Sequence, residues 1–134
     1  MEFKYLHFHQ LNTRWKDLDA FGHINNAIFL SYIEDARITL LNNLQINSSS
    51  KSIIIASIKI DYQSQINHPK SLLIGQYISR IGSTSFDIQA DILSNDKKTS
   101  YARSKATCVC FNYITNDKLK VYQEIKDSYI TNQK

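Results

Sequence analysis

The most informative segment of this chain reads Trp15-Lys16-Asp17-Leu18-Asp19-Ala20-Phe21-Gly22-His23-Ile24-Asn25-Asn26. It gathers two carboxylates, one imidazole, two amides and a glycine directly before an apolar helical pattern over 27–44. The start of a helix offers backbone N–H donors and the positive end of its dipole. Asp19 and His23 carry groups that can attack a substrate or move a proton. The segment therefore predicts a reaction site where a loop leads into a buried helix.

The length and composition are those of one globular domain. The chain has 134 residues, 43% of them hydrophobic and 21% charged. We expect a single domain over 1–134, with a core over about 1–115 and a polar surface tail over 116–134. No apolar run is long enough to cross a bilayer, and the first ten residues lack the order of a signal peptide. These features favour a cytoplasmic protein without membrane insertion. Cys108 and Cys110 are spaced for neither a zinc site nor a disulfide, so two reduced thiols are expected.

The net charge of +4 indicates a solvated basic surface. It is also compatible with an anionic small substrate, such as a thioester that carries a nucleotide. Lys and Arg are scattered and form no recognition motif, so no nucleic-acid partner is expected.

The rest of the chain alternates in the manner of β-strands. Apolar residues at 54, 56, 58 and 60 are predicted to share one face of the second strand. In the fifth strand, small residues from Ala102 to Cys110 would let a helix approach closely. The predicted strands are Tyr5–Trp15, Ile53–Gln65, Leu72–Ile81, Ser85–Ser94 and Tyr101–Tyr113.

One helix is predicted, because apolar residues recur at three- and four-residue steps from Phe29 to Leu44. Its apolar arc is wide, so most of its sides must be covered. Asn25 or Asn26 can cap its start. The order of strand, helix and four strands gives an α+β fold, in which a five-stranded antiparallel sheet wraps around one central helix.

The run D-x-D-x-x-G-H-x-N-N-x-x-F-x-x-x-x-E-x-A-R, from Asp17 to Arg37, resembles the signature of hot-dog-fold acyl-CoA thioesterases. The 4-hydroxybenzoyl-CoA thioesterase-like group is the most similar. Weaker similarity continues through Ile60-Asp61-Tyr62, Gly75 and the run from Arg80 to Phe86. The resemblance implies the hot-dog fold and hydrolysis of an acyl thioester of coenzyme A or acyl carrier protein, without metal or cofactor. It also implies a homodimer or homotetramer with active sites at the subunit interface.

The resemblance assigns roles to single residues. Asp19 matches the catalytic carboxylate of the family, as nucleophile or general base. The backbone N–H near Asn26 matches the group that polarises the thioester carbonyl. The benzoyl-type enzymes have no histidine at the position of His23, and plant-type acyl carrier protein thioesterases carry asparagine where this chain has Phe21. The resemblance therefore supports Asp19 better than His23, which equally well braces the turn.

Further residues are expected to bind substrate. Gly22 would supply a backbone conformation that other residues resist. Asn25 and Asn26 cap the helix, which does not exclude a role in the site, and Phe29 would line the acyl pocket. Hydroxyl and N–H groups of the turn after the third strand, together with one arginine, would hold pantetheine or phosphate groups, although a plain polar hairpin explains them too. The residues concerned are Arg80, Ser83, Thr84 and Ser85.

Glu34 and Arg37 lie three residues apart on the helix, where an ion pair is the simplest interpretation. Glu34 is the backup catalytic carboxylate, since some hot-dog branches use a carboxylate on the helix. Two other functions are open. A hydratase or dehydratase motif would have four residues between Asp and His, whereas three separate Asp19 from His23 here. A non-catalytic acyl-thioester binding module would lack the catalytic carboxylate.

Overall fold

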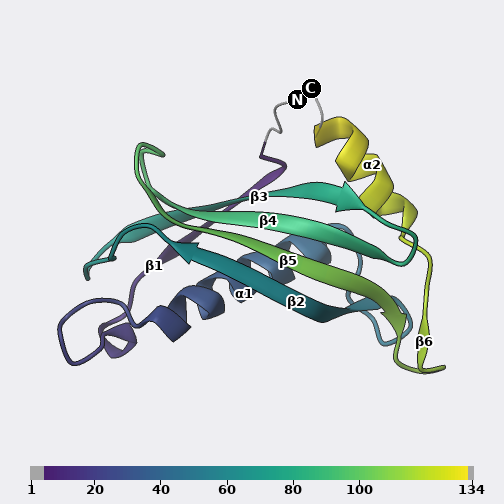
Figure 1. Cartoon of the computed structure of the whole chain (residues 1–134), viewed down its shortest axis with the longest axis horizontal. Helices are drawn as coiled ribbons and strands as arrows, with labels where there is room; N and C mark the ends of the chain where they lie inside the picture. Colours follow the sequence, from purple (N-terminus) through teal and green to yellow (C-terminus); the bar gives the residue numbers. More distant parts are fainter. Residues whose placement is uncertain (1–4, 133–134) are drawn as a thin grey trace.

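Alternating apolar residues and short turns build a curled antiparallel sheet, which the computed structural model describes within residues 5–132 (Figure 1). The strand order is β1-β3-β4-β5-β2, and the two-residue β6 pairs with β5. The predicted fold class is confirmed, and the five predicted strands are found to within a few residues; the two-residue β6 adds a short sixth strand beside β5. The strands are β1 His7–Asn12, β2 Ser52–Tyr62, β3 Ser71–Ile81, β4 Ser85–Ser94, β5 Ser100–Asn112 and β6 Asp117–Lys118.

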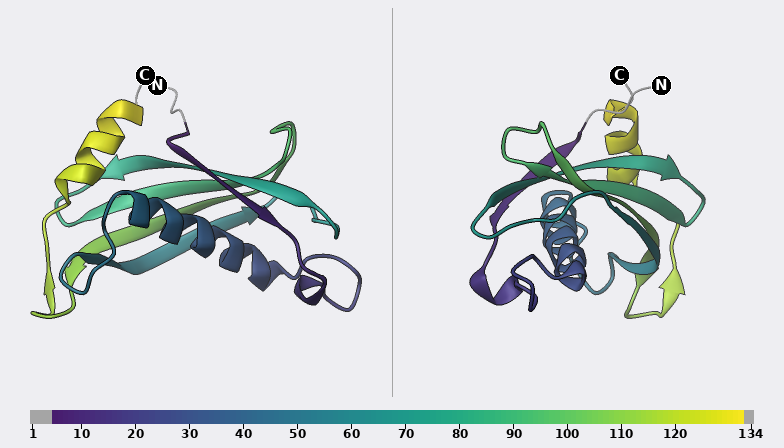
Figure 2. Two further views of the ribbon diagram at one scale, coloured as in Figure 1. Left: turned by 180° about the vertical axis from the view of Figure 1, so that it is seen from behind. Right: turned by 60° about the vertical axis from the view of Figure 1, so that its left-hand side comes forward.

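The predicted central helix is α1, Asn26–Asn43, which lies in the concave face of the sheet (Figure 2). A 3₁₀ turn, η1 Trp15–Asp17, follows β1 and connects it to the loop that precedes α1. Asn25 caps α1, because its side-chain Oδ1 accepts a 2.9 Å hydrogen bond from the N–H of Ala27. Within residues 5–132, no helix has the length and apolarity needed to span a membrane.

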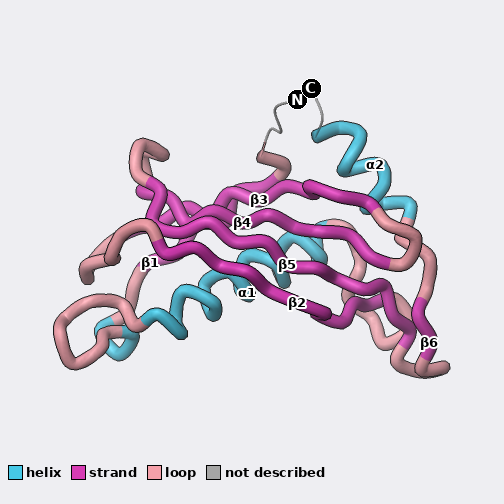
Figure 3. The backbone as a smooth tube through the Cα atoms, viewed as in Figure 1, coloured by secondary structure: helices cyan, strands magenta, loops and turns pink. Residues whose placement is uncertain are grey.

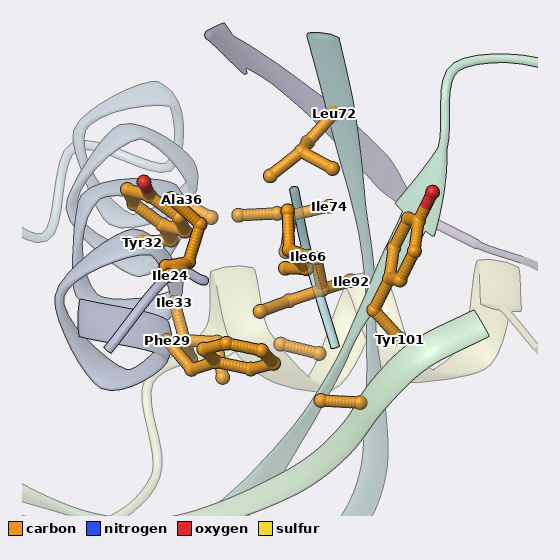
Figure 4. Packing of buried hydrophobic residues seen from close by; sticks show 12 residues of the cluster. Ile24, Phe29, Tyr32, Ile33, Ala36, Ile66, Leu72, Ile74, Ile92 and Tyr101 are labelled. Atoms are coloured by element: carbon orange, nitrogen blue, oxygen red, sulfur yellow. The ribbon is translucent and has the colours of Figure 1, made fainter. Parts of the chain in front are cut away.

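The core lies between α1 and the sheet (Figure 4). Phe29 and Ile33 of α1 face Ile74 of β3 and Ile92 of β4, and all four are nearly excluded from solvent. Burial of these side chains holds α1 in one position relative to the sheet, since apolar burial is the main favourable contribution to folding. The start of α1 is therefore fixed against the strands, which matters for the site below.

The prediction that residues 54, 56, 58 and 60 share one face of β2 was wrong in part. Directly opposed residues of an antiparallel pair share a face. Ile55 opposes the buried Cys108, but Ile58 opposes the buried Ala106, because the register shifts between Ile55 and Ser57. This bulge changes the side on which alternate residues fall. Ile55, Ile58 and Ile60 therefore face α1, whereas Ile54 lies on the opposite face and does not share a side with Ile58.

The segment after residue 115 is more than the polar surface tail that its composition predicts. It carries β6 and a second helix, α2 Gln123–Asn132, which packs beside β3 at the end of the sheet away from the start of α1 (Figure 3). Val121 and Ile125 are buried in the same cluster as Leu40 of α1. Only a few residues of this segment point into the core, and its mostly polar composition therefore gives little sign of a buried helix.

Candidate active site

The loop before α1 folds back on itself around Asp19. The N–H of Asp19 donates a 2.7 Å hydrogen bond to the carbonyl of His23, and Leu18 forms a bridge with Ile24. Gly22 lies at the tip with φ of +84°, a conformation that side chains resist, as the sequence predicts. The N–H of Ile24 donates to the carbonyl of Ile66, so the loop is attached to the segment that follows β2.

The carboxylate of Asp19 is held by backbone donors of its own loop. Oδ1 accepts hydrogen bonds from the N–H groups of Phe21 (2.8 Å) and His23 (3.2 Å). These donors hold the pKa of the Asp19 carboxyl below its usual value, so the group is ionised at neutral pH. Both hydrogen bonds end on Oδ1, which leaves Oδ2 to contact a substrate or water.

The start of α1 presents one unused donor next to this loop. The N–H of Ala27 is satisfied by Asn25, and the N–H of Ile28 donates to the Asn25 carbonyl. Among the described residues, the N–H of Asn26 has no acceptor. The Tyr62 hydroxyl donates a 3.0 Å hydrogen bond to the carbonyl of Asn26, which ties the end of β2 to the helix start. A free N–H at a helix start is suited to a carbonyl oxygen that gains negative charge.

These groups line one open cleft of about 230 Å³ between the loop, the start of α1 and the end of β2. Of the residues predicted from the sequence, Asp19, His23, Asn26 and Phe29 line it. The Phe29 ring packs edge-on against Tyr62, with 5.2 Å between the ring centroids. Sequence reasoning missed the wall formed by β2 and the residues after it, although Tyr62 stands in the weaker family-like run. The full lining is Asp19, His23, Ile24, Asn26, Phe29, Tyr62, Gln63, Ser64 and Gln65.

The other predicted residues lie elsewhere. Gly22 and Asn25 support the cleft from the loop and the helix cap without lining it. The β3–β4 turn, with Ser83, Thr84 and Ser85, lies at the opposite end of the sheet, close to α2 (Figure 1). There Arg80 forms an ion pair with Asp87 and donates to the Ser85 hydroxyl. Within one chain, the structure does not bring these residues to the cleft.

Glu34 is also separate from the cleft. It is exposed on α1 and lines a second groove, farther along the helix, together with Arg37. Within residues 5–132, no group of three or more His, Cys, Asp or Glu side chains is arranged to hold a metal ion. The cleft therefore offers a carboxylate, an imidazole and a backbone N–H as its reactive groups.

The sequence profile of the thioesterase-like superfamily matches residues 13–128, which include the whole cleft. The chain belongs to this superfamily, a group of thioester hydrolases, and the resemblance to 4-hydroxybenzoyl-CoA thioesterase-like proteins is confirmed. It is also similar to the uncharacterized protein YsmA of Bacillus subtilis (strain 168), at 31% identity over 83 residues. That match covers 60% of this chain and 56% of YsmA, so the aligned region spans just over half of that protein.

Solved structures share the fold. The PA2801 protein from Pseudomonas aeruginosa superposes with a TM-score of 0.86 at 22% identity, over 92% of this chain and 98% of that one. Slr0204, a 1,4-dihydroxy-2-naphthoyl-CoA thioesterase from Synechocystis, superposes with a TM-score of 0.79 at 16% identity, over 92% and 94% of the two chains. At these identities the likeness concerns the fold alone, and it confirms the hot-dog architecture expected from the sequence.

Proposed function

We propose that this chain hydrolyses acyl-CoA thioesters to a free carboxylic acid and coenzyme A, with Asp19 acting at the thioester carbonyl. One observation carries this proposal: the ionised carboxylate of Asp19 lines the same cleft as Asn26, whose N–H has no acceptor within residues 5–132. Thioester hydrolysis needs a group that attacks the carbonyl carbon or activates water, and a donor for the oxygen that becomes negative.

In the proposed mechanism, Oδ2 of Asp19 attacks the carbonyl carbon of the thioester. The carbonyl oxygen becomes an oxyanion and accepts a hydrogen bond from the N–H of Asn26. Collapse of this intermediate breaks the carbon–sulfur bond, releases coenzyme A as a thiolate and leaves an anhydride on Asp19. Water then adds to the anhydride, which frees the carboxylic acid and restores the carboxylate of Asp19. The second proton of this water goes to the thiolate or to solvent.

The hydrogen bonds on Asp19 lower the pKa of its carboxyl group, which reduces its strength both as a general base and as a nucleophile. The pKa therefore does not choose between attack by Asp19 and activation of water. A single turnover in H₂¹⁸O tests for the nucleophilic role. Label in the Asp19 carboxyl group together with an unlabelled first acid identifies Asp19 as the nucleophile, because only water that opens the anhydride at the Asp19 carbon gives this pattern. A labelled first acid results if Asp19 activates water or if water opens the anhydride at the acyl carbon.

His23 has the position of an accessory group. It lines the cleft, and its backbone N–H holds the Asp19 carboxylate. We assign its imidazole to binding the water of the second step or to returning a proton to the leaving thiolate. Coenzyme A as the carrier is supported by Slr0204, which is named for a CoA thioester.

We also propose that two copies pair through β2. This strand ends the sheet order, so one of its edges has no partner strand within the described part of the chain. Ile54, Ile58 and Tyr62 are exposed along it. Unpaired edges are normally covered or paired in native proteins. A second copy along β2 would enclose the cleft, whose wall includes the end of the same strand.

Release of thiol from acyl-CoAs of varied chain length and aromaticity tests the function. The account predicts thiol release that is stoichiometric with free acid for at least one thioester. Hydration of an unsaturated acyl-CoA without thiol release would instead identify a hydratase. Binding without either reaction would identify a non-catalytic module.

A further inference from the structure

A second groove, of about 500 Å³, lies between the later turns of α1 and the first half of β2. Its walls combine apolar and polar side chains, with Ile38 and Leu41 of the helix and Ile53 and Ile55 of the strand forming the apolar part. Its one cationic side chain is Arg37, and the mechanism above does not use it.

Most of the Arg37 side chain is buried, and no described residue accepts a hydrogen bond from its guanidinium. Its side chain is only 8% exposed, and among the described residues its single charged partner is Glu34, 4.0 Å away. That separation is too long for a hydrogen bond. A guanidinium carries five N–H donors. None of the Arg37 nitrogens is among the fully buried atoms without a partner, so they remain accessible to solvent. Arg37 is therefore a strong donor that lines a groove and has no protein acceptor among the described residues.

Neither neighbouring acid group supplies that acceptor. The side chain of Glu34 is 62% exposed, so water solvates its carboxylate. Cys108 lies close enough for Arg37 to favour its thiolate, yet burial raises the pKa of that thiol to about 12 and keeps it neutral. A carboxylate that enters the groove would give Arg37 the paired hydrogen bonds that planar guanidinium groups prefer.

The groove continues the line of the cleft along α1. Asn26, Leu30, Glu34 and Arg37 follow one another at steps of three and four residues, which places them on one face of the helix. At about 1.5 Å per residue, Arg37 lies roughly 16 Å along the axis from Asn26. On β2, Tyr62 borders the cleft and Ile55 borders the groove. An acyl chain with its thioester at Asn26 would extend along this face toward Arg37.

We propose that Arg37 binds a carboxylate at the far end of the acyl chain, so that the preferred substrates are ω-carboxyacyl thioesters of medium length. This inference rests on the proposed function, because it assumes a thioester in the Asp19 cleft. The negative charge of Glu34 repels the carboxylate of such a substrate and thereby reduces the preference for carboxylated over plain acyl chains.

Two matched substrates test the proposal: decanoyl-CoA and 9-carboxynonanoyl-CoA, which share ten acyl carbons and differ in one terminal carboxylate. We expect the wild-type protein to favour the carboxylated thioester by about tenfold or more in kcat/KM. Arg37→Met keeps the volume and should abolish that preference while altering kcat/KM for decanoyl-CoA less than about threefold. Glu34→Gln removes the competing charge at an exposed position and should increase the preference. Pairs with eight and twelve carbons locate the best length.

Calorimetry with two non-hydrolysable thioethers, S-decyl-CoA and S-(9-carboxynonyl)-CoA, separates this inference from the proposed function. Tighter binding of the carboxylated thioether that Arg37→Met removes supports the role of Arg37, even if no thioester is hydrolysed. Hydrolysis of thioesters with no preference at any length overturns the inference and leaves the function standing. Should Arg37→Met fail to fold, the wild-type preference and its increase in Glu34→Gln decide the question, and the absence of either overturns the inference.

Discussion

The phenol of Tyr32 donates a 2.5 Å hydrogen bond to Oδ2 of Asp17, and this contact joins the second turn of α1 to the loop that carries Asp19. Arg14 donates to the same carboxylate from the other side, so Asp17 is only 1% exposed. The backbone carbonyl of Asp17 also accepts from the N–H of Asn25, directly before α1. The first aspartate of the D-x-D pair thus anchors the loop, whereas the second lines the cleft.

Asp17→Asn should lower the free energy of unfolding by about 2 kcal/mol at pH 7, since it weakens hydrogen bonds to a buried charge. Burial raises the pKa of the Asp17 carboxyl, but the Arg14 and Tyr32 hydrogen bonds outweigh it and leave the pKa below its usual value. The stabilisation is therefore present above the unfolded pKa of about 3.9 and is lost as the pH falls through the lower folded pKa. Urea unfolding of wild type and variant from pH 7 to pH 2 should show a difference that shrinks toward acid. Asp117→Asn, at an exposed site, is the control, and an undiminished difference at pH 2 would contradict the assignment.

Tyr62→Phe removes the hydroxyl that donates to the Asn26 carbonyl and keeps the ring against Phe29. Because this contact positions the start of α1, we expect kcat/KM to fall by about three- to tenfold with little change in unfolding midpoint. Tyr122→Phe is the matched control, since its hydroxyl donates to a backbone carbonyl, that of Ser52, at the other end of β2. Equal kinetic effects of the two variants would argue against a positioning role for Tyr62.

The C-terminal helix α2 should stabilise the fold only through its buried face, which carries Ile125. Ile125 is 0% exposed and Ile130 is 69% exposed on the same helix. Ile125→Ala should cost about 2–4 kcal/mol of unfolding free energy, and Ile130→Ala less than about 0.5 kcal/mol. Equal effects in chemical denaturation would mean that α2 does not belong to the core.

Assembly through β2 predicts that a charge on its exposed edge separates the copies. Ile58→Lys should shift sedimentation toward the monomer and reduce thiol release, because lysine at an edge opposes strand pairing. Ile130→Lys, at an exposed site on α2, should change neither quantity. A wild-type protein that is monomeric and fully active at assay concentration would rule out the proposed pairing.

Much of this structure follows from local patterns in the sequence. The spacing of Phe29 and Ile33 predicts α1, and the polar segment before it predicts the loop around Asp19, because both depend on residues close together in the chain. The bulge in β2 was missed, since one extra residue at Ala56 leaves no mark in the composition. The β3–β4 turn was assigned to the substrate because its chemistry suits phosphate, but the order of strands sends Ser83 to the far end of the sheet. The unused N–H of Asn26 and the buried charge of Arg37 depend on three-dimensional packing that no short pattern records.

The central claim, that Asp19 acts at the thioester carbonyl, is tested most directly by thiol release from acyl-CoA with Asp19→Asn. This substitution keeps the shape of the side chain and an oxygen that can accept from the Phe21 and His23 N–H groups, but it removes the charge. The account predicts that kcat falls by about a thousandfold or more, while the unfolding midpoint and the Kd for a non-hydrolysable acyl-CoA thioether stay close to wild type. Turnover within about tenfold of wild type would contradict the account and would turn attention to Glu34.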